Sequence, residues 1–201
     1  MRLALISLLL FTGIKAFSKD DFKIQLNDTT LEISLDNLYN IQLDEKKIKL
    51  KAVSKDTLVY EDDLFSFNYT KGYKISKMTI GEGIEQIMLM TAEGSGLLIQ
   101  KYSKFNPTML NEMMISQVTE ESLNYGFKLK RSDYTRKLKS GQNLDVDKAI
   151  LTYKDETNIY EVASIGKKDE GILIMTMITE KNMSPQALKI INLMWNSITY
   201  K

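Results

Sequence analysis

The chain of 201 residues contains no cysteine and no histidine, and it has only two prolines. Without cysteine there is no disulfide and no thiol nucleophile, and without histidine the usual catalytic triads are excluded. Together these absences remove the common ligand sets for zinc and copper(II). We therefore expect no cofactor and no metal site, and a hydrophobic core that stabilises the fold by itself.

The amino terminus has an apolar run, Leu3 to Phe11, that follows Arg2 and is far shorter than the roughly 20 residues of a membrane span. The charge, the apolar stretch and the small residues after it predict a secretory signal over residues 1–18, cleaved after Ala16 or Ser18. The rival interpretation is an uncleaved anchor. Because no cysteine follows the signal, a bacterial lipoprotein is excluded. We expect an exported protein, periplasmic or extracellular and soluble, with no integral membrane segment after cleavage.

Neither sign of charge dominates the chain. Once residues 1–18 are removed, 25 basic and 26 acidic residues remain. A balance this close to neutral gives no reason to expect nucleic acid or an anionic membrane as a partner. The few prolines and the ten glycines leave little room for linkers, so the chain is expected to be compact.

An internal repeat marks the first part of the chain. Residues 23–33 align with residues 40–50, and in each copy apolar and polar residues alternate on both sides of a turn. This pattern predicts two β-hairpins with turns at Asn27-Asp28 and Asp44-Glu45. Two copies are too few for a solenoid. We therefore predict an N-terminal β-hairpin module over residues 19–60.

A different order of elements begins at Leu64. Alternation and turn residues predict strands over residues 64–69, 84–91, 96–102, 127–131, 134–138, 148–154, 159–165 and 172–178. One helix is expected to begin at Asn106-Pro107 and to stop at Gly126, and a second begins at Ser184-Pro185. Runs of strands with two separated helices predict an α+β domain over residues 64–201, with an antiparallel sheet on which both helices pack. The strand over residues 172–178 is apolar on both faces, so it should lie centrally.

This layout resembles the PsbP-like and DcrB-like fold family. The resemblance rests on the aromatic strand Phe65-Ser66-Phe67-Asn68-Tyr69, the following Gly72-Tyr73, the strand pair, the helix after Asn106-Pro107 and the closing helix after a serine and a proline. It implies the fold and a habit of binding partners. The family shares no common catalytic set, so the resemblance implies no site residue.

Few patterns suggest catalysis. Ser164 and Lys167 form a Ser-x-x-Lys match, but the pair lies at a strand end, whereas such enzymes place the serine at the start of a helix. The acidic clusters, Asp145 and Asp147 among them, lack the spacing and glycine of a calcium loop. We therefore expect that the protein is not an enzyme. A hydrolase that uses carboxylates or a serine and a lysine is our second alternative.

Methionine is the most suggestive residue type that is present. Six methionines recur at spacings that place them on strand faces and on the first helix: Met88, Met90, Met113, Met114, Met175 and Met177. Thioethers are flexible and polarisable, so these side chains either fill the core or line a pocket for a lipophilic small molecule. Copper(I) is a further ligand that thioethers accept. A carrier or sensor of a lipophilic molecule is our first alternative.

The main hypothesis is an exported, non-enzymatic protein that binds another envelope or extracellular protein. It requires an exposed apolar, aromatic or charged patch. The candidates are Tyr69 and Tyr73, together with the basic residues Lys128, Lys130 and Arg136. A lysine-rich edge strand that resists aggregation is the alternative interpretation of the basic residues. Aromatic residues near them are too few to indicate nucleic acid.

Overall fold

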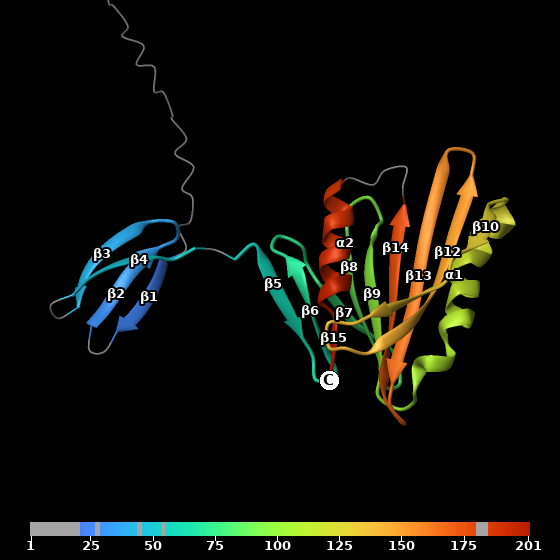
Figure 1. The fold of residues 1–201 in the computed structure, drawn as a ribbon, viewed down its shortest axis with the longest axis horizontal. Helices are drawn as coiled ribbons and strands as arrows, with labels where there is room; N and C mark the ends of the chain where they lie inside the picture. Colours follow the sequence, from blue (N-terminus) through green and yellow to red (C-terminus); the bar gives the residue numbers. More distant parts are fainter. Residues whose placement is uncertain (1–20, 27–28, 44–45, 54, 180–184) are drawn as a thin grey trace, which may run out of the picture. The chain divides into compact units, whose positions relative to one another are not determined.

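The structure, a computed structural model, describes residues 21–26, 29–43, 46–53, 55–179 and 185–201 (Figure 1). The described residues divide into two compact units, one that ends at residue 55 and one that begins at residue 56. Among the described residues, no helix is long and apolar enough to cross a membrane.

The first unit consists of the two predicted hairpins. Strand β1 (Asp21–Leu26) pairs with β2 (Thr29–Ser34), and β3 (Leu38–Leu43) pairs with β4 (Lys46–Lys51), both antiparallel. The predicted turn pairs Asn27-Asp28 and Asp44-Glu45 lie outside the described residues. The backbone N–H of Asp36 donates to the carbonyl of Ala52, which continues the pairing just beyond the open end of the β3–β4 hairpin. Among the described residues of this unit, Ile33 is the buried hydrophobic one, with 2% of its surface exposed.

The second unit is built on two antiparallel sheets, which confirms the predicted α+β class. The large sheet has the order β10-β12-β13-β14-β9-β8-β7, and β11 also pairs with β12. Its strands are β7 (Ser76–Gly81), β8 (Ile84–Met90), β9 (Gly96–Tyr102), β10 (Lys128–Arg131), β11 (Tyr134–Lys137), β12 (Asn143–Tyr153), β13 (Glu156–Gly166) and β14 (Gly171–Thr179). The small sheet has the order β15-β6-β5, with β5 (Thr57–Glu61), β6 (Phe65–Thr70) and β15 (Thr199–Tyr200).

Strand β14 lies at the centre of the large sheet, as its two apolar faces predicted. Ile172 and Ile174 belong to a core cluster that also contains residues of α2 (Pro185–Ser197) and of β6. Leu173 and Met175 point to the other face and belong to a second cluster with Met114 of α1 (Asn111–Tyr125). The sheet therefore lies between α1 on one face and α2 with the small sheet on the other (Figure 1).

The first helix begins later than the sequence predicted. Pro107–Met109 form a short 3-10 turn, and the Asn106 side chain caps that turn by accepting a hydrogen bond from Thr108 N at 3.0 Å. The α-helix itself starts at Asn111 and stops at Gly126, as predicted. The second helix begins at Pro185, and its predicted cap, Ser184, lies outside the described residues.

Three strands were not predicted, and one of them shifts the division between the units. Strand β5 falls in the segment that the sequence assigned to the N-terminal module, but it pairs with β6 and so belongs to the second unit. Strand β7 is an exposed edge with no clear alternation of burial. Strand β15 has two residues, and its pairing with β6 bridges more than a hundred residues of sequence.

A buried carboxylate anchors α2 to the sheet. Glu161 of β13 accepts hydrogen bonds from the Trp195 indole at 3.1 Å, from Lys148 Nζ at 3.0 Å and from the Thr176 hydroxyl at 3.4 Å. Burial by itself would raise the pKa of Glu161, but the bonds from Lys148 and Trp195 outweigh it and hold the pKa below its usual value. The ionised form of Glu161 is therefore the one that the fold stabilises.

Replacing Glu161 by glutamine should lower the free energy of unfolding by about 2 kcal/mol near neutral pH, because charged hydrogen bonds are lost. A lowered native pKa contributes stability above the unfolded pKa, and that contribution disappears as pH falls through the native value. The difference between wild type and Glu161→Gln should therefore narrow as pH falls below the ordinary value of 4.5. Urea unfolding at a series of pH values around 4.5 measures this difference in unfolding free energy. The control is Glu120→Gln, because Glu120 is exposed. A difference that stays constant with pH would contradict the role given to Glu161.

Candidate functional site

The carboxyl end of α1 forms an open surface hollow of the second unit. The helix stops because Gly126 adopts a left-handed conformation, with φ of 106°. Its N–H donates to the Leu123 carbonyl at 3.0 Å, and Phe127 N donates to the Ser122 carbonyl at 3.0 Å. This glycine cap reverses the chain within one residue, so the aromatic residues on either side of it both face the end of β12.

Three aromatic rings meet at this cap. The ring of Tyr153, the last residue of β12, lies 5.5 Å from the ring of Tyr125 and 5.3 Å from that of Phe127, measured between centroids. Tyr125 and Phe127 are themselves 6.3 Å apart. Tyr125 is nevertheless 71% exposed, which is unusual for a large side chain with two aromatic neighbours. Tyr125 and Tyr153 meet edge to face, with an angle of 69° between the ring planes.

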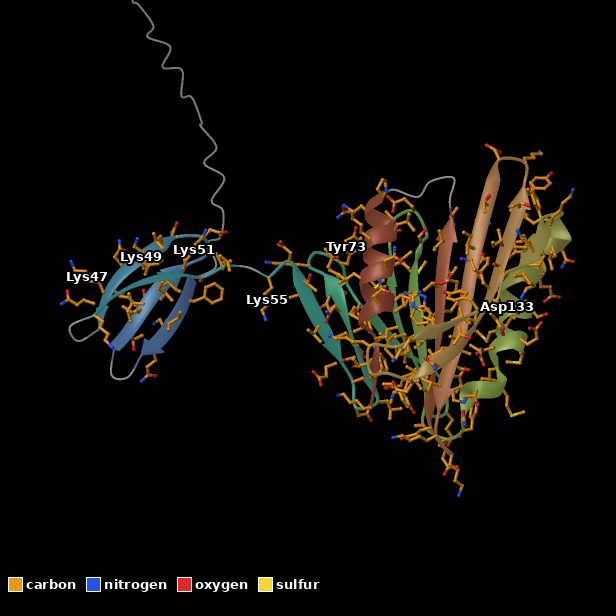
Figure 2. The ribbon with its side chains drawn as sticks, in the orientation of Figure 1. Lys47, Lys49, Lys51, Lys55, Tyr73 and Asp133 are labelled. Atoms are coloured by element: carbon orange, nitrogen blue, oxygen red, sulfur yellow. The ribbon has the colours of Figure 1, made fainter. Side chains whose placement is uncertain are left out.

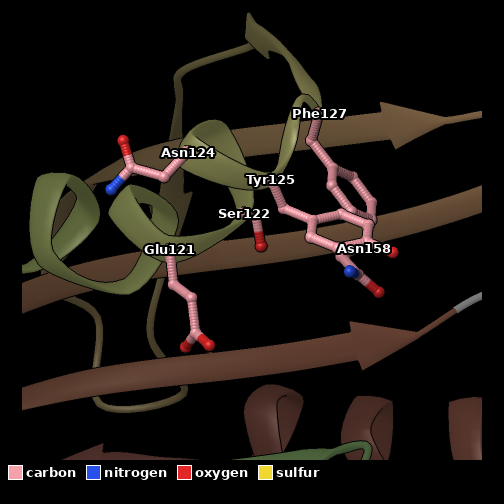
Figure 3. Close-up of a pocket in the computed structure, with 6 residues that line it drawn as sticks. All are labelled: Glu121, Ser122, Asn124, Tyr125, Phe127 and Asn158. Atoms are coloured by element: carbon pink, nitrogen blue, oxygen red, sulfur yellow. The ribbon is translucent and has the colours of Figure 1, made fainter.

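Polar side chains surround the rings. The hollow has a volume of about 430 Å³, and Figure 3 shows its lining residues at the end of the helix and on β13: Glu121, Ser122, Asn124, Tyr125, Phe127 and Asn158. Neither Asn124 nor Asn158 has a side-chain hydrogen bond to another residue in the described part of the chain. Burial and the negative charge of Glu121 raise the pKa of the neighbouring Tyr160. We call these six residues and Tyr153 the aromatic hollow.

The aromatic hollow has the features of a recognition surface. It combines an exposed ring, a carboxylate and two amides, which are groups that bind a side chain by stacking, by cation–π contact and by hydrogen bonds. It is open to solvent, whereas a small-molecule pocket encloses most of its ligand. The sequence analysis missed this site. The signal for it was a predicted helix stop, Gly126, with an aromatic residue on each side.

The methionines of the carrier hypothesis lie largely together. Met114 and Met175 are buried in one cluster, against which Met88 and Met177 pack. Met90 lies over Gly96 of the neighbouring strand, and Met113 is 54% exposed on α1. No methionine lines the aromatic hollow or four further hollows in the described part of the chain. The arrangement gives core filling a clear physical basis, and the carrier hypothesis stays a prediction.

Tyr69 and Tyr73 are less accessible than the binding hypothesis assumed. Both are partly buried and pack against the core cluster beneath α2. Tyr69 also meets the ring of Phe67 edge-on, with centroids 6.4 Å apart. Their aromatic surface thus contributes to the core of the second unit.

The basic residues of β10 and β11 lie on one face of the sheet. Strand register places Lys128 and Lys130 on the same side as Arg136. The two lysines are exposed, but Arg136 lies over the Trp195 ring at 4.6 Å and donates to the Asn196 side chain. Arg136 therefore helps to hold α2, and the predicted basic patch retains its two exposed lysines.

The residues of the hydrolase alternative have separate partners. Ser164 Oγ forms a hydrogen bond with Asn111 Oδ1 at 2.7 Å, whereas Lys167 Nζ donates to the Lys201 carbonyl at 3.3 Å. Asp147 pairs with Arg131 at 3.3 Å. No group of three or more acidic side chains that could hold a metal ion occurs among the described residues.

The second unit has the PsbP-like layout that the sequence indicated, from the aromatic strand β6 through the β8–β9 pair and α1 to the closing α2. No protein-family model matches the chain, and no curated protein matches it. Among solved structures, it is similar to cyanobacterial PsbP (CyanoP) from Synechocystis sp. PCC 6803, with a TM-score of 0.48 and 11% identity over 73% of this chain and 93% of that one. A structure from Bacteroides thetaiotaomicron has a TM-score of 0.36 and 11% identity over 73% of this chain and 48% of that one.

Proposed function

We propose that the chain is an exported, non-enzymatic protein that binds another protein of the envelope or extracellular space through the aromatic hollow. The observation that carries this proposal is Tyr125, whose ring is 71% exposed while it contacts two further aromatic rings. Tyrosines held rigidly by neighbours lose little entropy on binding, and they dominate the energy of many protein interfaces.

The chemistry of the hollow favours a partner that presents a basic side chain. The Glu121 carboxylate is exposed and has no ion pair among the described residues. An ammonium or guanidinium group placed there would meet the carboxylate and the face of Tyr125 together. The hollow of about 430 Å³ is the size of one or two side chains rather than of an enclosed ligand.

Export supplies the setting for such a partner. The order of Arg2, the apolar run and the small residues supports a cleaved signal, and the absence of cysteine is compatible with an oxidising compartment because no thiol is at risk. A stable antiparallel core without disulfides would fold there without an oxidant.

The export proposal predicts the amino terminus of the protein in its own host. Intact-mass measurement should find a chain that begins at Phe17 or Lys19. Replacing Leu8 by arginine, which interrupts the apolar run, should leave an uncleaved chain inside the cell. A wild-type protein that retains residues 1–18 would contradict cleavage.

The binding proposal predicts the effect of single substitutions in the hollow. A photo-crosslinking residue at Asn124 should capture one protein in the host, and that partner should then be purified for titration. Tyr125→Ala should weaken its binding by at least about thirtyfold, as expected for an interface hot spot. The single variant Glu121→Lys should also weaken binding, because it places a positive charge opposite the basic side chain proposed for the partner.

The matched control is Met109→Ala, since Met109 is another exposed apolar side chain of the second unit, with 89% of its surface accessible. Its affinity should stay near that of wild type. Equal affinity for wild type and Tyr125→Ala would remove the hollow from the interface. If Tyr125→Ala and Met109→Ala reduce the affinity for the partner equally, exposed apolar surface in general, and not the aromatic hollow, is responsible for binding.

A further inference from the structure

The two hairpins of the first unit have the same register but very different charges. In β1–β2, Lys23 lies opposite Glu32 and the two form an ion pair at 3.1 Å. The equivalent cross-strand pair of β3–β4 is Asn40 with Lys49. The second copy of the repeat therefore has a lysine where the first copy has the glutamate that balances its charge.

The lysines of β4 gather on one face of their hairpin. Side chains alternate along a strand, so Lys47, Lys49 and Lys51 point to the same side, as Figure 2 shows. The residues opposite them on β3 are, in order, Gln42, Asn40 and Leu38. We call these six residues the lysine face. Neither strand contains an acidic residue, so the face combines three ammonium groups, two amides and one leucine.

This arrangement opposes the folding of its own unit. Neighbouring lysines on one strand face are only about 7 Å apart and repel one another. Lys51 lies 3.5 Å from Asp36, but Lys47 and Lys49 have no acidic partner among the described residues. A unit whose described residues include one buried hydrophobic side chain has little stability to spare for such repulsion. Binding to an anionic surface would neutralise the lysines and so remove the repulsion between them.

The composition of the lysine face indicates what kind of anionic surface fits. It has no arginine, whose planar group recognises individual phosphates or carboxylates in pairs, and no aromatic ring for stacking on a base or a sugar. Flexible lysines respond to charge density instead. Leu38 is 58% exposed on this face, and Val53, just beyond β4, is 64% exposed, so apolar side chains accompany the charges. Lysines with exposed apolar residues are typical of peripheral membrane contact.

We propose that the lysine face binds the surface of a membrane that contains anionic phospholipid. The near-neutral total charge of the chain concealed this feature because the acidic residues lie elsewhere. The interaction is electrostatic and peripheral, and it does not depend on the aromatic hollow of the second unit. An exported chain without a lipid anchor would thereby be retained at a membrane.

The test is co-sedimentation of residues 19–201 with vesicles of phosphatidylcholine, with or without phosphatidylglycerol. Omitting residues 1–18 prevents the apolar run from binding the vesicles by itself. Wild type should bind the phosphatidylglycerol vesicles and not the neutral ones. Lys47→Gln/Lys49→Gln/Lys51→Gln should bind them roughly a hundredfold more weakly, because each of the three lysines contributes about fivefold. Binding should fall as salt rises from about 0.1 M to about 1 M.

Two matched variants separate charge on this face from total charge and from misfolding. Lys74→Gln/Lys139→Gln/Lys168→Gln removes the same charge from exposed positions of the second unit and should bind like wild type. Lys47→Arg/Lys49→Arg/Lys51→Arg keeps the charge and should also retain binding. The proposal is overturned if wild type fails to bind phosphatidylglycerol vesicles, binds neutral vesicles equally well, or loses no affinity in the glutamine variant of the lysine face. Equal losses in the two glutamine variants would overturn it as well.

Discussion

Strand β14 is apolar on both faces, and the architecture of the second unit follows from the need to cover both of them. Ile172 and Ile174 require a layer on one side, which α2 and the small sheet provide. Leu173 and Met175 require a layer on the other side, where α1 lies together with Met88 and Met177. Because no disulfide is available, this double burial must supply most of the stability, and the ionised Glu161 fixes where α2 sits on the sheet by bonding to Trp195.

The sequence was informative wherever a local pattern decided the structure. Alternation in the repeat predicted both hairpins, the two apolar faces of residues 172–178 predicted the central strand, and Gly126 predicted the end of α1. It was uninformative where long-range pairing decides. Strand β15 exists because Thr199 and Tyr200 meet β6, and no local pattern records such a partner. The start of α1 was misplaced because Asn106-Pro107 is an equally good opening for a 3-10 turn.

The contrast between local patterns and long-range pairing also explains why only part of the candidate site could be predicted from the sequence. Tyr125 and Phe127 flank a helix stop that can be read from the sequence, but Tyr153 joins them only through the pairing of β10 with β12. The predicted tyrosines, Tyr69 and Tyr73, contribute to the core instead, since the small sheet packs over the α2 face. Likewise, a near-zero net charge gave no hint that one hairpin concentrates lysines on a single face. The net charge sums over the whole chain, so it does not show that lysines gather on one face of one hairpin.

The central claim is that this protein acts by binding another protein and not by carrying a small lipophilic molecule. Native mass spectrometry of the protein, purified gently from its own host, tests that claim most directly because it records every bound mass, whatever the partner is. The account predicts a complex with a second polypeptide and no stoichiometric small molecule. A bound lipophile that remains in Tyr125→Ala and is lost when Met88 and Met175 are made polar would contradict it and would assign the function to the methionines.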